Sequence, residues 1–121
     1  MNERILLVED DPLVLRTLQA VLKRERYKCD AYLKPEDAIA AARDGKFDLI
    51  ISDIRMPGKN GVEAMKSIKE KFKNSSKKDV PIVFITGYAD DAVLLNAEGL
   101  GEVVLKPFDL DRFLMTIREY L

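Results

Sequence analysis

Short apolar runs alternate with segments of helical period along almost the whole chain, and this alternation constrains the fold more than any other feature. Five such runs have the length and composition of β-strands, and apolar residues recur every three or four positions between them. Strands separated by helices pair in parallel and are covered by helices on both faces. The chain is therefore expected to form an α/β sandwich of three layers around a five-stranded parallel sheet.

Two of the runs differ in a way that predicts their places in the sheet. Ile5–Val8 is apolar at every position, which is typical of a strand with both faces covered, so we expect it inside the sheet. Tyr27–Tyr32 alternates apolar and polar residues, which is typical of a strand with one face in water, so we expect it at an edge. The other strands are expected at Phe47–Ser52, Val80–Ile85 and Val103–Leu105.

Capping residues and prolines indicate where the intervening helices begin. Asp11 precedes Pro12 and is expected to cap a first helix that runs to about Glu25. Asp109 is expected to cap the last helix in the same way. The other three helices are expected to begin at Pro35, after Gly61, and at Asp90 or Asp91.

The composition excludes several classes of protein. A chain of 121 residues with 47% hydrophobic content is expected to form a single domain over residues 1–121. Twenty basic residues against 21 acidic ones leave a net charge of −1, so no direct nucleic-acid binding is expected. No run has the length of a membrane span or a signal peptide, and a cytoplasmic location is expected. With one cysteine and no histidine, an internal disulfide and zinc chemistry are excluded.

The residues at the carboxyl ends of the expected strands carry the chemistry of the chain. All strands of a parallel sheet point the same way, so these residues collect at one edge, where open α/β folds place their sites. They are Glu9, Asp10 and Asp11 after the first strand, Asp53 after the third, Thr86 after the fourth and Lys106 after the fifth. We expect these carboxylates, the hydroxyl and the ammonium to converge.

Such a set is typical of a phosphoryl site with a divalent metal. Clustered carboxylates repel one another unless a cation lies among them, and oxygen ligands with room for water suit Mg²⁺. A lysine and a threonine hydroxyl can contact phosphoryl oxygens. Because no serine, cysteine or histidine nucleophile belongs to the set, a carboxylate is the group able to attack phosphorus, which would give an aspartyl phosphate.

Each of these residues also has a simpler interpretation. Capping of the first helix accounts for Asp11 better than metal binding does. Asp53 could cap a turn, Thr86 could bond a nearby backbone group, and Lys106 could extend into water from a sheet edge. These separate explanations do not account for acid, acid, hydroxyl and ammonium at successive strand ends, so the joint interpretation is preferred.

Four segments in order identify a family. Ile5–Pro12, Asp53–Gly58 followed by Gly61, Ile85–Gly87 and Leu105–Phe108 closely resemble the receiver domain of two-component response regulators, of the chemotaxis-regulator type. The resemblance extends from about Arg4 to Leu121. It implies a flavodoxin-like fold with strand order 2-1-3-4-5 and five helices, which agrees with the edge position expected for the second strand.

The resemblance also implies a magnesium site. By position, Asp53 is the phosphoacceptor and one of the Mg²⁺ ligands. Glu9 and Asp10 form the acidic pair, with Asp10 as the more direct ligand and Glu9 acting through water. The backbone carbonyl of Arg55 completes the protein ligands.

The remaining implications concern phosphoryl transfer. Thr86 and Lys106 contact the phosphoryl group, and the Lys106–Pro107 peptide is cis in the family. The donor is a phosphohistidine of a histidine kinase or a phosphotransfer protein, supplied in trans, and the output partner is unknown. The function implied is a signalling phosphoacceptor, with Mg²⁺-dependent self-phosphorylation and autodephosphorylation as its only chemistry.

One position departs from the family pattern. Receivers usually carry Phe or Tyr three residues before the lysine, and that ring turns inward when the threonine moves to the phosphate. Here the position is Val103, which lacks a ring. The switch candidates are therefore Thr86, Val103 and the nearest aromatic residue, Tyr88.

Three alternatives remain open at this point. A phosphatase resembling the haloacid dehalogenase family would need an acid two residues after the nucleophile, where this chain has Arg55. A flavin-binding flavodoxin would need a hydroxyl-rich loop after the first strand, where this chain has three acids. A receiver fold that acts only as a constitutive interaction module would not need the phosphorylation residues.

Overall fold

A parallel sheet forms the centre of the molecule. The computed structural model describes residues 3–44, 46–54, 61–74, 80–87, 99–106 and 109–121. The strands are paired in parallel in the order β2-β1-β3-β4-β5, which confirms the predicted order, the edge position of the second strand and the interior position of the first. They are β1 (Arg4–Val8), β2 (Lys28–Tyr32), β3 (Leu49–Asp53), β4 (Ile82–Thr86) and β5 (Glu102–Leu105).

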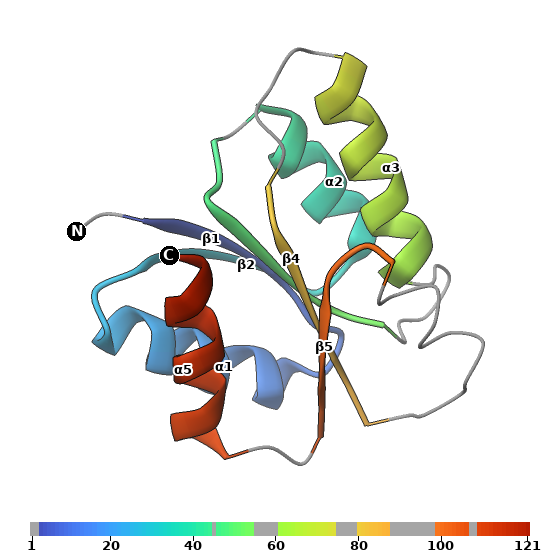
Figure 1. Cartoon of the computed structure of the whole chain (residues 1–121). Coiled ribbons are helices and arrows are strands. Elements are labelled where there is room, and N and C mark those ends of the chain that lie inside the picture. Colours follow the sequence, from blue (N-terminus) through green and yellow to red (C-terminus); the bar gives the residue numbers. More distant parts are fainter. Residues whose placement is uncertain (1–2, 45, 55–60, 75–79, 88–98, 107–108) are drawn as a thin grey trace.

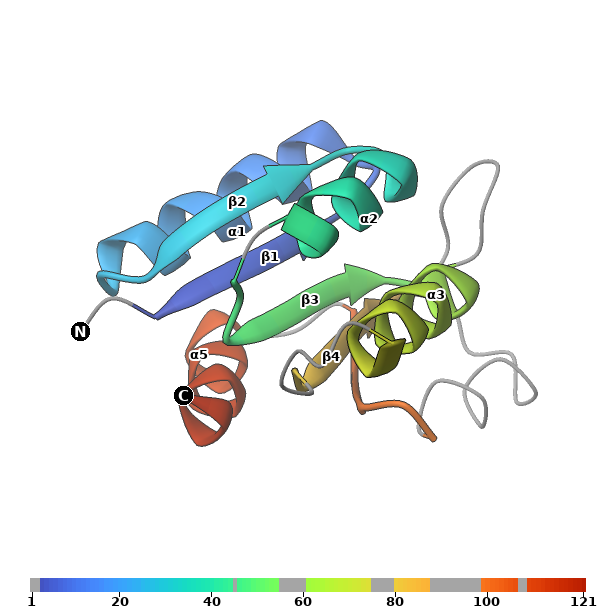
Figure 2. The same cartoon turned by 90° about the horizontal axis from the view of Figure 1, so that it is seen from above.

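Helices cover both faces of the sheet, as predicted. In the described residues they are α1 (Pro12–Arg24), α2 (Pro35–Asp44), α3 (Gly61–Asn74) and α5 (Leu110–Tyr120). Figures 1 and 2 show α1 and α5 on one face and α2 and α3 on the other. The helix expected to begin at Asp90 or Asp91 lies outside the described residues. None of the described helices has the length and apolarity needed to cross a membrane.

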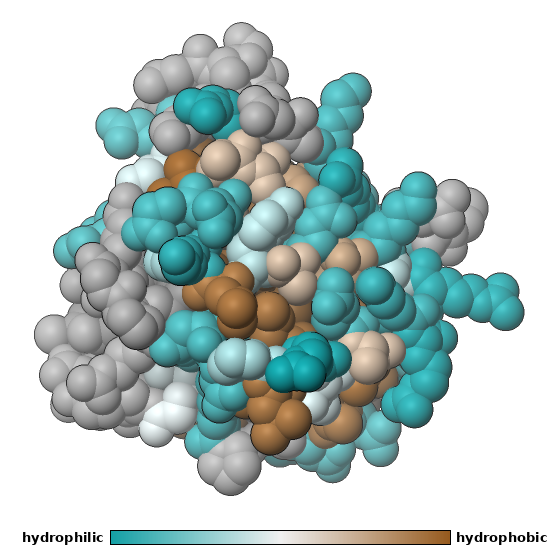
Figure 3. Space-filling view, turned by 180° about the vertical axis from the view of Figure 1, so that it is seen from behind, coloured by the Kyte–Doolittle hydropathy of each residue, from teal (hydrophilic) through white to brown (hydrophobic). Residues whose placement is uncertain are grey.

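The two faces of the sheet bury separate apolar clusters. On β1, Leu6 and Val8 pack under α2 and α3, whereas Ile5 and Leu7 pack under α1 and α5. This two-sided burial explains why the first strand shows no polar alternation in the sequence. At the sheet edge, Lys28 of β2 is exposed and Asp30 is half-buried. The face of the molecule seen from behind is mostly hydrophilic, with apolar groups near its centre (Figure 3).

Two strands, β3 and β4, begin two residues later than the sequence predicts, whereas the starts of β1, β2 and β5 differ from the prediction by one residue. β3 begins at Leu49 rather than at Phe47, and β4 begins at Ile82 rather than at Val80. Phe47 and Val80 are buried in the cluster under α2 and α3, so their apolar character reflects core packing before strand pairing begins. Both strands also extend one residue further than predicted, so Asp53 and Thr86 are the last residues of their strands rather than the residues that follow them.

The caps of two helices are as predicted. Asp11 Oδ1 accepts hydrogen bonds from the backbone N–H groups of Leu13 at 2.9 Å and Val14 at 3.4 Å, and Pro12 opens α1. Asp109 Oδ1 accepts from the N–H of Asp111 at 2.8 Å at the start of α5. The Asp11 cap fixes the direction in which the chain leaves β1, and hence the position of the loop that carries Glu9 and Asp10.

Gly101 is required by a close approach of backbone at the start of β5. A Cβ atom at this position would lie 1.9 Å from the carbonyl oxygen of Ile82, whereas a Cβ at Gly87 would meet its nearest neighbour, Lys106 Cβ, at 3.7 Å. Gly101→Ala is therefore expected to lower the free energy of unfolding by about 2 kcal/mol, the cost of overpacking a well-packed site. Gly87→Ala is expected to change it by less than about 0.5 kcal/mol. Denaturant titration of both variants measures the difference, and equal stabilities would contradict the packing argument.

Candidate functional site

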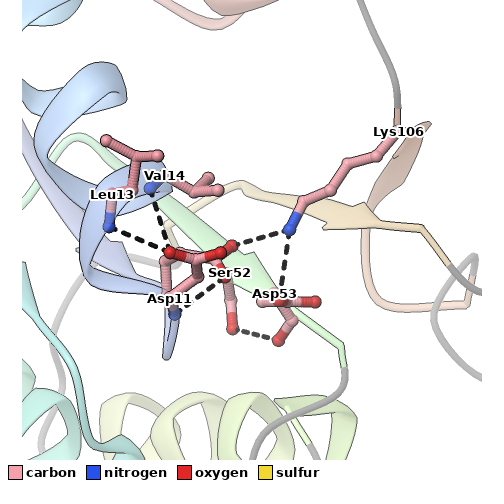
Figure 4. A network of polar contacts seen from close by, with 7 residues as sticks. Asp11, Leu13, Val14, Ser52, Asp53 and Lys106 are labelled. Carbon is pink, nitrogen blue, oxygen red and sulfur yellow. Dashed lines mark hydrogen bonds and ion pairs between the residues drawn. The ribbon is translucent and has the colours of Figure 1, made fainter.

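The carboxyl ends of the strands bring the predicted polar side chains together. The carboxylate oxygens of Glu9, Asp10 and Asp53 lie within 4.8 Å of one another. The ammonium Nζ of Lys106 lies 3.0 Å from Oε2 of Glu9 and 3.4 Å from Oδ2 of Asp53. Figure 4 shows Lys106 reaching toward Asp53 from the end of β5. The convergence predicted from the sequence is therefore confirmed for these four residues.

Glu9 is held at both ends of its carboxylate. Its side chain is buried, and Oε1 accepts a hydrogen bond from the backbone N–H of Asp11 at 3.2 Å while Oε2 accepts from Lys106. Its own N–H donates to the carbonyl of Tyr32 at 3.1 Å, just beyond the last β1–β2 pair. The orientation of this acid is thus fixed by the backbone around it and by one ammonium.

Lys106 is placed by the backbone of the adjacent strand. Its N–H donates to the carbonyl of Thr86 at 2.7 Å, so the pairing of β4 and β5 continues one residue past Leu105. Thr86 itself is buried at the end of β4. Thr86 and Lys106 therefore lie side by side at the carboxyl ends of β4 and β5.

The electrostatics of the cluster favour a bound cation. Burial, followed by the neighbouring Asp53, raises the pKa of the Glu9 carboxyl from 4.5 to about 7, against the lowering effect of Lys106. Burial acts to lower the pKa of the Lys106 ammonium, but its contacts with Glu9 and Asp53 outweigh burial and raise it. One ammonium therefore does not fully offset acids held this close, and an opposite charge among them would favour their ionised form.

The donor set fits a hard divalent cation. All three candidate side-chain ligands are carboxylates, and oxygen donors with space left for water are what Mg²⁺ prefers. Cys29, the single cysteine, is buried in the core under α1 and α5, and burial raises the pKa of its thiol to about 12. A soft-metal site and a thiolate nucleophile are both incompatible with this arrangement.

The simpler interpretation of Asp11 is correct. Its carboxylate caps α1, and it is the backbone N–H of Asp11 that contacts Glu9. Of the other predicted site positions, Arg55, Tyr88 and Pro107 lie outside the described residues. Val103 is half-buried on β5, opposite the buried Phe84 of β4, and packs against the cluster under α2 and α3.

The sequence interpretation missed one residue, Ser52. Its hydroxyl is completely buried beside Asp53 and donates to the backbone carbonyl of Asp53 at 2.9 Å (Figure 4). The signal in the sequence was a hydroxyl at the end of an otherwise apolar run, Leu49–Ile51. A buried hydroxyl costs free energy unless it is hydrogen-bonded, so its presence there indicates a specific partner.

Comparison with known proteins identifies one family. The family model of the response regulator receiver domain matches residues 5–118. The transcriptional regulatory protein CrdR of Helicobacter pylori is 32% identical over 122 residues, which cover 99% of this chain and 55% of CrdR. The chain spans about half the length of the curated relatives it matches.

Two solved structures share both the fold and appreciable sequence identity. The response regulator protein TrrA of Thermotoga maritima, in complex with Mg²⁺ and BeF, is 31% identical with a TM-score of 0.85 and covers 98% of this chain and 99% of its own. The non-phosphorylated HemR receiver domain of Leptospira biflexa is 33% identical with a TM-score of 0.86, covering 98% and 93%.

Proposed function

This chain belongs to the response regulator receiver domain family of two-component signalling, and on that basis we propose that it accepts a phosphoryl group on Asp53 in a Mg²⁺-dependent reaction. Membership of the family supports this proposal over the flavin-binding and phosphatase alternatives. In this proposal residues 1–121 form a single receiver domain that acts as a signalling phosphoacceptor rather than as an enzyme. The proposal includes a cytoplasmic location and a phosphohistidine donor supplied in trans, since the chain has no histidine.

The observation that carries the proposal is that Asp53 contacts one ammonium and lies close to two further acids. Its buried carboxylate lies 3.4 Å from Lys106 Nζ and within 4.8 Å of the oxygens of Glu9 and Asp10. A nucleophilic carboxylate needs charge compensation for the phosphoryl oxygens it approaches, and Lys106 supplies a fixed positive charge on that side. Glu9, Asp10 and Asp53 would hold Mg²⁺, which supplies further charge compensation to the phosphoryl oxygens when bound.

The proposed step forms one bond and breaks one. An oxygen of Asp53 attacks phosphorus, the bond from phosphorus to the donor's imidazole nitrogen breaks, and that nitrogen keeps the electron pair and takes up a proton. The product is an acyl phosphate on Asp53. We assign Thr86 and Lys106 to contact with the phosphoryl oxygens, and the carbonyl of Arg55 to the metal, by analogy with the family.

Conformational change in this chain is proposed to differ from the common pattern because of Val103. Phosphate can favour an active state only through contacts that differ between the two states. The valine side chain packs against the cluster under α2 and α3, and its restricted χ1 and short reach cannot replace an inward-turning ring. We therefore assign the switch to Thr86 and the loop that follows it, including Tyr88.

The function is tested by phosphorylation of the purified chain with acetyl phosphate. We expect the mass increase of one phosphoryl group in the presence of Mg²⁺, and none after the metal is removed with a chelator. The product should be cleaved by hydroxylamine, which attacks acyl phosphates but not phosphoserine or phosphothreonine. A label that forms equally without metal, or that resists hydroxylamine, would contradict the proposal.

Lys106→Ala is expected to separate phosphoryl uptake from the response to it. Uptake should persist at a rate reduced about tenfold, because the nucleophile and the metal ligands remain, while the charge contact that distinguishes the phosphorylated state is lost. Amide hydrogen exchange over residues 80–87 and 99–106, with and without Mg²⁺ and beryllofluoride, measures the response. Lys28→Ala, at an exposed lysine of β2, is the matched control and should respond like the wild type. An unaltered response in Lys106→Ala would be evidence against this role.

A further inference from the structure

Ser52 places a completely buried hydroxyl next to Asp53, the proposed phosphoacceptor. Ser52 lies on β3 between Val8 of β1 and Phe84 of β4, and none of its surface is exposed. Its side chain is on the same face of the sheet as those of Ile50 and Ile54, which belong to the cluster under α2 and α3. An apolar residue would suit this environment better, so the hydroxyl requires an explanation from its hydrogen bond.

That bond stabilises the backbone where pairing with β1 ends. The last pair between β1 and β3 is Val8 with Ser52, so the carbonyl of Asp53 lies one residue beyond the end of that ladder. Ser52 Oγ donates to this carbonyl at 2.9 Å. On the other side of the same peptide, the N–H of Ile54 donates to the carbonyl of Ile85 at 3.2 Å.

Both polar groups of the Asp53–Ile54 peptide, the carbonyl of Asp53 and the N–H of Ile54, are hydrogen-bonded, and this fixes the backbone of Asp53. A peptide unit is planar, so hydrogen bonds to its carbonyl and to its N–H together prevent it from rotating about the bonds that flank it. Asp53 is also paired with Ile85 across β3 and β4. The direction of the Asp53 side chain, and with it the 3.4 Å contact to Lys106, thus depends on the orientation of this peptide.

From this geometry we propose that Ser52 is a positioning residue for phosphoryl transfer, which rests on the proposed function of Asp53. The Ser52 hydroxyl holds the Asp53–Ile54 peptide so that the Asp53 carboxylate is aimed at the incoming phosphorus. Attack requires the reacting atoms to be aligned, and a misplacement of about 1 Å can cost on the order of 100-fold in rate. Removing the hydroxyl should therefore lower the rate of transfer more than the affinity for the metal.

Two matched pairs of variants isolate the hydroxyl. The first pair is the wild type and Ser52→Ala, which differ only in the hydroxyl. The second pair is Ser52→Thr and Ser52→Val, which have nearly the same shape, with a hydroxyl in the first and a methyl group in its place in the second. With acetyl phosphate and Mg²⁺, we expect the maximal rate of phosphorylation to be about tenfold higher in the member of each pair that carries the hydroxyl. This effect is smaller than the roughly 100-fold loss that a misplacement of about 1 Å can cause. The Mg²⁺ affinity and the donor concentration at half-maximal rate should agree within about twofold. If the threonine and valine pair fails to fold, the serine and alanine pair decides.

Ile50→Val controls for a general effect of core packing, because it alters the same face of the same strand without touching the hydroxyl. It should phosphorylate at the wild-type rate, with the folded fraction of every variant checked by denaturant titration. Equal maximal rates in wild type and Ser52→Ala would overturn the positioning role and leave Ser52 as a space-filling residue. Absence of phosphorylation in the wild type would instead refute the proposed function itself.

Discussion

Asp53→Asn is expected to abolish phosphoryl incorporation, with a fall in rate of at least roughly 1,000-fold. An amide keeps the shape of the side chain and can still accept a hydrogen bond from Lys106, but it lacks the charged oxygen that attacks phosphorus. The variant should therefore fold and retain its core while it loses the reaction. Incorporation is measured by intact mass and by radiolabel from a phosphodonor, with the modified residue mapped in the wild type.

Asp48→Asn is the matched control for that variant. Asp48 precedes β3 at the opposite end of the strand, where its exposed carboxylate accepts a hydrogen bond from the N–H of Arg4 at 2.8 Å. The same change of charge is made far from the site, so phosphorylation should proceed at the wild-type rate. A hydroxylamine-labile label that survives in Asp53→Asn at the wild-type level would show that another residue is the acceptor.

The second large effect is expected from Asp10→Asn, which should weaken Mg²⁺ binding about 100-fold or more. Asp10 is one of three acids whose oxygens lie within 4.8 Å of one another, and the resemblance makes it the more direct ligand of the pair. Loss of its charge should also reduce phosphorylation at low metal concentration, with partial recovery at high concentration. Titration with Mg²⁺, followed by calorimetry or by the phosphorylation rate, measures both effects.

Asp11→Asn provides the control one residue away. The Asp11 carboxylate caps α1, and asparagine caps a helix about as well as aspartate does. The substitution changes the net charge by the same amount as Asp10→Asn, but it should leave the metal affinity within about twofold of the wild type. Equal losses in the two variants would indicate a general charge effect rather than a ligand at Asp10.

The order of the sheet was predictable because the sequence pattern reports burial. Ile5–Val8 is buried on both faces and Lys28–Tyr32 lies at an edge, so apolar continuity in one and alternation in the other follow from their positions. Strand ends were less predictable. Phe47 and Val80 are buried without being paired, and an apolar pattern does not distinguish packing from hydrogen bonding.

The members of the site were predictable, but their contacts were not. A parallel sheet brings strand ends to one edge, which was enough to group Glu9, Asp53 and Lys106. That the Lys106 ammonium bridges both acids depends on side-chain reach and on the extra backbone bond to Thr86, which spacing does not encode. Ser52 was missed because its partner is a backbone carbonyl, so the sequence shows only one polar residue at the end of an apolar run and no second side chain to pair with it.

The distance in sequence between Lys106 and its partners has a consequence for how the chain is made. Lys106 lies 97 positions after Glu9 and 53 after Asp53, so a ribosome completes β1, β3 and β4 before it supplies the ammonium that contacts both acids. Domains fold as the chain emerges from its amino-terminal end, and a buried acid without a partner charge is strongly destabilising. We therefore expect the acidic edge of the nascent sheet to be buried stably only after β5 is added, so that Asp53 is among the last residues of the sheet to be enclosed.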